Sequence, residues 1–146
     1  MPLEIGEPSG KVNSFLVSKA YADLTGYDTA AAFTVTGDVA VRVVGVVGAT
    51  GITSTSGTTT VAVGTTESAG SIIAATTIDN SDFAATDVWV DTSPTVDSKI
   101  MTEDWVIVGG GADIILTRNV DDLTAGALTL YCEWKALSSG ATIVAA

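Results

Sequence analysis

Strict alternation of apolar and polar side chains near the C-terminal end constrains the fold of this chain more than any other feature. In ALTLYCEWKAL, residues 127–137, one set of alternate positions is apolar and comprises Leu128, Leu130, Cys132, Trp134 and Ala136. The positions between them are Thr129, Tyr131, Glu133 and Lys135. Because successive side chains of a strand point to opposite faces, this pattern predicts a strand with one buried and one exposed face.

The same period of two recurs upstream in FTVTGDVAVRV, residues 33–43, where Gly37 marks a turn or a bulge. The following VVGVVG loses the alternation, which predicts burial on both faces. The loop ATGITSTSG and the segment TTTVAVG come next, and we interpret them as the turn and return strand of a hairpin. The segment SAGSIIAATT is open between a short helix and a strand.

Many short strands separated by turns rich in Gly, Ser, Thr and Asp predict an all-β fold. We expect an antiparallel β-sandwich or barrel-like domain over residues 11–146. The preceding residues 1–10, MPLEIGEPSG, hold two of the three prolines and show no periodicity. They are interpreted as an extended N-terminal arm, with a frayed terminus as the alternative.

The sequence offers few groups for catalysis, and we predict that the protein is not an enzyme and needs no cofactor. Histidine is absent, which removes the commonest general base and transition-metal ligand. Cys132 lies on the apolar side of its strand, which predicts a buried structural thiol. The run Gly109–Gly111 lacks the spacing and the following helix of a phosphate-binding loop, so a bulge or tight turn is the better interpretation.

Two groups of oxygen-bearing side chains raise the question of a metal site. One lies at Asp79, Asn80 and Asp82, and the other at Asn119, Asp121 and Asp122. Neither matches the twelve-residue calcium loop, and Asp and Asn are also the ordinary residues of turns. We predict no metal site, and a weak calcium site at Asp79/Asp82 or Asp121/Asp122 stays open as the alternative.

Composition limits the partners. The net charge of −11, from 17 acidic against 6 basic residues, argues against nucleic acid and against an anionic membrane surface. Residues 1–12 lack the basic and apolar blocks of a signal peptide, and the most apolar segment, residues 39–49, is too short to span a bilayer.

Hydrophobic residues form 47% of the chain and charged residues only 16%, which favours burial against partners, although abundant Ala and Val also explain it. Trp89, Trp105 and Trp134 all fall in expected strands. They are predicted to anchor the core, with an exposed tryptophan at an interface as the alternative.

Several phrases of the chain resemble capsid decoration proteins, also called cement or auxiliary head proteins, of tailed bacteriophages. The phrases are FTVTGDVAVRVVGVVG, TTTVAVGTTESAGSIIAATT, DVWVDTSP and ADIILTRNVDDLTAGALTLYCEWKALSSGATIVAA. Their order and content cover roughly residues 30–146.

The resemblance implies a virion structural protein that is assembled in the host cytoplasm and lies on the outer capsid surface. It implies the major capsid protein as a partner, together with copies of the chain itself, often as a trimer. A tail or head–tail joining protein, or a surface- or carbohydrate-binding β module such as a head fibre, is the alternative. The family pattern supplies no site residues. From the sequence of the arm we expect Pro2, Leu3, Ile5 and Pro8 to contact the capsid.

Overall fold

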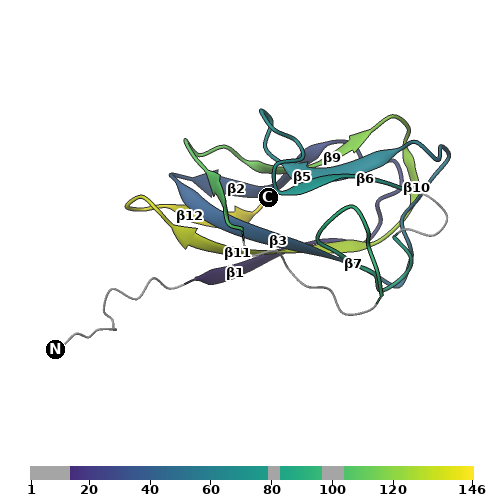
Figure 1. Ribbon diagram of the computed structural model, residues 1–146, viewed down its shortest axis with the longest axis horizontal. Coiled ribbons are helices and arrows are strands. Elements are labelled where there is room, and N and C mark those ends of the chain that lie inside the picture. The colour runs from purple at the N-terminus through teal and green to yellow at the C-terminus, as the bar shows by residue number, and fades with distance from the viewer. Residues whose placement is uncertain (1–13, 79–82, 97–103) are drawn as a thin grey trace.

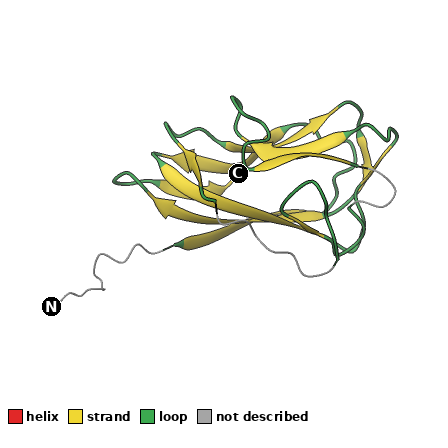
Figure 2. Cartoon of the chain, in the orientation of Figure 1, coloured by secondary structure: helices red, strands yellow, loops and turns green. Residues whose placement is uncertain are grey.

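The computed structural model describes residues 14–78, 83–96 and 104–146, and these residues form strands and loops without a helix (Figure 2). They therefore contain no helix that is long and apolar enough to cross a membrane. Two antiparallel five-stranded sheets pack face to face (Figure 1). The predicted all-β sandwich is confirmed, and the expected arm, residues 1–10, lies outside the described residues.

The first sheet, called sheet A here, is built around two long central strands. The order of its main strands is β1 (Phe15–Tyr21), β11 (Leu128–Ala136) and β3 (Val39–Val47). The far edge of β3 pairs with two short strands, β7 (Val88–Trp89) and β8 (Val106–Val108). Residues far apart in the sequence therefore share one sheet.

The second sheet, sheet B, covers the other side of the core. Its strand order is β12 (Thr142–Ala145), β2 (Ala30–Thr36), β9 (Ile114–Asn119), β5 (Thr60–Gly64) and β6 (Ile73–Thr77). A separate two-stranded ribbon joins β4 (Thr53–Ser54) to β10 (Leu123–Ala125). The segment SAGSIIAATT, which the sequence leaves open between helix and strand, thus supplies a strand.

Strand β11 confirms the alternation that its sequence predicts. Leu130 and Cys132 are fully buried and Trp134 is nearly so, whereas Tyr131 is exposed. Cys132 lies directly opposite Val17 of β1 and Val43 of β3, so the same inward row continues across the three strands. The hydrophobic surface that these rows bury between the sheets is the main favourable contribution to folding.

Gly37 confirms the predicted turn, and the turn moves the chain from one sheet to the other, because β2 belongs to sheet B and β3 to sheet A. Gly37 has a φ of 74°, and an added Cβ would lie 2.7 Å from Oγ of Ser138. Both the conformation and the close approach favour glycine here. The neighbouring Asp38 accepts a hydrogen bond from the amide of Gly110 at 2.8 Å, which ties this corner to the glycine turn.

The predicted hairpin, in which the segment TTTVAVG returns along the strand that precedes the loop ATGITSTSG, is wrong. Strand β3 lies in sheet A, while β5 lies in sheet B and pairs with β6 and β9. The intervening loop crosses from one sheet to the other. The valines of β3 and β5 therefore enter the core from opposite sides.

The prediction that the VVGVVG part of β3 is buried on both faces is also wrong. Val43 and Val47 are buried, whereas Val44 and Val46 are only half-buried. The strand keeps the ordinary alternation, and valine occupies its outer face as well as its inner one.

Trp89 fills the centre of the sandwich beneath Gly45. Its indole N–H donates a hydrogen bond to Oγ1 of Thr76 at 2.9 Å, and its ring meets Phe83 edge-on with centroids 5.1 Å apart. Gly45 is the cross-strand partner of Trp89, and a Cβ added there would lie 2.9 Å from Cε3 of the indole. The missing side chain of Gly45 therefore makes room for the ring.

Replacing Gly45 with Ala should lower the free energy of unfolding by about 1–3 kcal/mol, because the new methyl group overpacks the core against Trp89. Gly57→Ala is the matched control, since a Cβ at Gly57 meets nothing within 4 Å. Urea unfolding followed by tryptophan fluorescence measures both variants. Equal stabilities of the two variants would contradict this description of the core.

Candidate interaction surface

The outer face of sheet A gathers side chains from three strands through their register. Leu16 of β1 lies opposite Glu133 of β11, which lies opposite Arg42 of β3. In the next outward row, Tyr131 lies opposite Val44. Because directly opposed residues share a face of the sheet, these side chains form one continuous outer surface.

This surface is apolar and open to solvent. Leu16 is 70% exposed and Tyr131 is 37% exposed. Phe15, which is 51% exposed, lies opposite the inward-facing Trp134 at the start of β1 and borders the surface from its edge. A groove of about 330 Å³ runs across the strands between them, and we call it the sheet A groove. It is lined by Ser14, Phe15, Leu16, Arg42, Val44, Tyr131 and Glu133. Exposed apolar side chains gathered around a hollow are typical of an interaction surface.

An ion pair forms the polar wall of the groove. Nη2 of Arg42 donates a hydrogen bond to Oε1 of Glu133 at 2.6 Å, and both side chains are partly exposed. Hydrogen bonds from Arg42 and Ser14 hold the pKa of the Glu133 carboxyl below its ordinary value. This wall is therefore fixed in position and charged at neutral pH.

Trp105 extends the outer face beyond the ion pair. The Arg42 guanidinium and the Lys135 ammonium each lie 4.4 Å from the centre of its ring. These are cation–π distances. The prediction that all three tryptophans anchor the core is thus confirmed for Trp89 and Trp134 and wrong for Trp105, which is half-buried on the outside. It precedes β8 and shares the outer side with the two cations.

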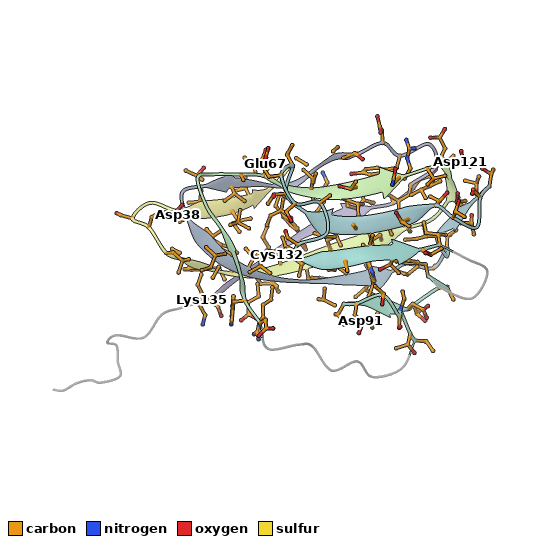
Figure 3. All side chains as sticks on the ribbon, turned by 45° about the horizontal axis from the view of Figure 1, so that its top comes forward. Asp38, Glu67, Asp91, Asp121, Cys132 and Lys135 are labelled. Atoms are coloured by element: carbon orange, nitrogen blue, oxygen red, sulfur yellow. The ribbon has the colours of Figure 1, made fainter. Side chains whose placement is uncertain are left out.

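The strands of sheet A avoid the acidic excess of the chain. They carry Lys19, Arg42 and Lys135 but a single carboxylate, Glu133. Figure 3 shows Lys135 at the outside of the sheet and Cys132 between the sheets. In a chain of net charge −11, the outward cations Arg42 and Lys135 reduce the repulsion that a negatively charged partner meets at this face.

The outer face of sheet B differs in chemistry. Its exposed positions include Thr34 and Thr36 of β2, which lie opposite Val144 and Thr142 of β12. The strands of this sheet contain Arg118 as their one charged residue. Short hydroxyl-bearing side chains suit a solvated pleated face, so sheet A offers the stronger candidate for binding.

The other residues that the sequence singled out have structural surroundings. Cys132 is fully buried, as predicted, and burial raises the pKa of its thiol to about 12. Gly110 and Gly111 have φ values of 68° and 73°, which confirms a tight turn in place of a phosphate loop. The buried thiol lacks the exposure that a reactive site needs, and the glycine turn has no side chains for chemistry.

The described part of the chain contains no side-chain cluster that supports the alternative of a calcium site. Within residues 14–78, 83–96 and 104–146, no three His, Cys, Asp or Glu side chains come together to hold a metal. Oδ1 of Asp122 lies 3.2 Å from Nη2 of Arg118, which also pairs with Asp28. Asp79 and Asp82 lie outside the described residues, as do Pro2, Leu3, Ile5 and Pro8.

No protein-family model matches the sequence, and no curated protein or solved structure matches the chain. The resemblance to decoration proteins therefore stays a prediction. Sequence reasoning missed the sheet A groove, because its residues come from positions 14–16, 42–44 and 131–133. A local signal is Leu16, an apolar residue that shares one side of its strand with Ser14 and Ser18.

The Arg42–Glu133 pair makes a prediction about proton binding. The pKa of Glu133 should lie below the ordinary value of about 4.3. Arg42→Gln should raise this pKa, because the hydrogen bond from Arg42 is the main cause of the lowering. The pair therefore adds stability at neutral pH that is lost as the pH falls through the lowered pKa. Carboxyl NMR titration measures this, and Lys19→Gln, whose Nζ bonds the Ala146 carbonyl, is the control. An unchanged pKa in Arg42→Gln would contradict the pairing.

The buried thiol makes a second prediction. Cys132 should not react with a disulfide reagent at pH 8 in the folded protein, because its thiol is buried and its pKa is raised to about 12. The thiol should react fully after unfolding in guanidinium. In the double variant Ser18→Cys with Cys132→Ser, the cysteine lies at an exposed position of β1 and should react without denaturant. Rapid labelling of folded wild-type protein would show that the core is open.

Proposed function

We propose that this chain is a virion structural protein, a capsid decoration protein that binds the outer surface of a tailed-phage head and stabilises contacts between capsomers. The observation that carries the proposal is the outer face of sheet A, where exposed apolar side chains surround a groove in a region of low acidity. The sequence resemblance supplies the kind of assembly.

The fold suits adhesion between large bodies. A sandwich with a tightly packed core presents its surface side chains in fixed positions, so little conformational entropy is lost on binding. Leu16, Phe15 and Tyr131 are already exposed, and burying them gains roughly 25 cal/mol per Å² of apolar surface. Modest affinity per copy becomes large when many linked copies bind one lattice.

The charge distribution supports the same function. A net charge of −11 keeps free copies soluble and keeps them away from packaged nucleic acid. Attachment then requires a face where the acidic excess is relieved, and the strands of sheet A provide one.

The N-terminal residues belong to the proposed attachment region. Ser14, the first described residue, lines the groove, so residues 1–10 join the domain close to the edge of this surface. Their apolar side chains, Pro2, Leu3, Ile5 and Pro8, extend the available contact area. The major capsid protein and further copies of the chain are the proposed partners.

Deleting residues 1–10 should leave a folded domain that no longer attaches to phage heads. The deletion leaves every described residue of the core and of the groove in place and removes the apolar side chains of the segment. Circular dichroism tests the fold, and co-sedimentation with heads that lack the protein tests attachment, with the full-length chain as the control. Full decoration by the truncated chain would show that attachment does not need this segment.

Two further measurements, copy number in purified particles and glycan binding, separate the other functions. A tail or head–tail joining protein would fail to cover heads and would appear in purified particles at the copy number of a single ring. A carbohydrate-binding module would bind glycans as the isolated domain. Either result would overturn the proposed decoration of the head.

A further inference from the structure

We propose that the sheet A groove of one copy binds the N-terminal segment, residues 1–10, of a second copy, so that copies join head to tail. The groove is an apolar hollow on the surface of the described domain, and the segment supplies matching chemistry from outside it. The inference does not depend on the capsid proposal, since the purified protein alone tests it.

The groove has the size and lining of a binding site for an extended peptide. Its volume of about 330 Å³ lies within the range of small-ligand sites. Leu16, Val44 and Tyr131 form its apolar floor and wall, and Leu16 is 70% exposed. When an apolar partner covers such an exposed side chain, a large apolar area is removed from water, which contributes favourably to the free energy of binding.

The segment MPLEIGEPSG complements this lining. Leu3 and Ile5 are two residues apart, so an extended segment presents both on one side, toward an apolar surface. The segment also carries Glu4 and Glu7 and no Lys or Arg. Two of the cations in the described chain, Arg42 and Lys135, lie on the outer face of sheet A beside the groove. Glu4 and Glu7 are thus opposite in charge to these two cations, while Glu133, the carboxylate that lines the groove, is already paired with Arg42.

Reach allows the exchange between copies. The 13 residues before Ser14 span up to about 43 Å when extended, which exceeds twice the radius of gyration of about 14 Å expected for a domain of this size. The groove crosses β1, β11 and β3, whereas the chain enters along β1 at Ser14. To bind its own groove, the segment would have to change direction immediately before Ser14 and run across the strands. The segment of a neighbouring copy can approach the groove from any direction.

Such a contact joins two different surfaces, the segment of one copy and the groove of the next. Repetition of a contact of this kind closes into a ring when the rotation between copies allows it. A ring of three agrees with the trimer that the sequence resemblance implies. Pro2, Leu3, Ile5 and Pro8 then lie against the groove of the neighbouring copy, and the outer faces of sheet A together with the bound segments form the surface proposed to meet the capsid.

Two full-length variants of equal exposure test the groove. Leu16→Asp places a carboxylate in the groove, where it repels Glu4 and Glu7 and removes the apolar contact. Ile107→Asp is the matched control, because Ile107 is also 70% exposed on a strand of sheet A but does not line the groove. Light scattering after size exclusion should show wild type and Ile107→Asp associating, with the dissociation constant at least tenfold higher for Leu16→Asp.

Mixing two disabled chains tests the exchange itself. The double variant Leu3→Asp with Ile5→Asp keeps the groove but loses the segment's apolar contacts, and Leu16→Asp keeps the segment but loses the groove. Each should be monomeric alone, and an equimolar mixture should form a one-to-one complex. A monomeric wild type, association of Leu16→Asp equal to that of Ile107→Asp, or a mixture without complex would each overturn the inference.

Discussion

The two-residue alternation of β11 is the constraint on which the rest of this structure depends. The strand pairs along its length with β1 and β3, so its register fixes theirs. A slip by one residue would turn Leu130, Cys132 and Trp134 to solvent and bring Glu133 into the core, at a cost that excludes it. The register that buries the core therefore also places Tyr131 and Glu133 on the outside, where they line the groove.

The sequence predicts the parts of the fold that local periodicity controls. The alternation of β11, the turn at Gly37 and the burial of Cys132 follow from residues close together in the chain. Periodicity does not say which sheet a strand joins, and for that reason the predicted hairpin of β3 with β5 is wrong. Trp105 shows the same limit, because its surroundings are set by Arg42 and Lys135, 63 and 30 positions away.

The groove lies beyond local prediction for a related reason. Its walls come from the beginning, the first third and the end of the chain, and only strand pairing brings them together. The sequence does give the charges within each expected strand, but only the sheet assignment shows that the strands of sheet A together carry a single carboxylate. The groove is identified only when the charges of the strands are combined with the pairing register of β1, β11 and β3.

The two short strands that pair with the far edge of β3 make the two edges of sheet A different. β8 covers Val39–Val41 and β7 covers Gly45–Val46, so this edge is capped in two separate pieces. A capped and interrupted edge offers no continuous hydrogen-bonding ladder to another chain. Any lengthening of the sheet by an additional strand is thereby directed to the opposite border, at β1, where the polypeptide enters the domain.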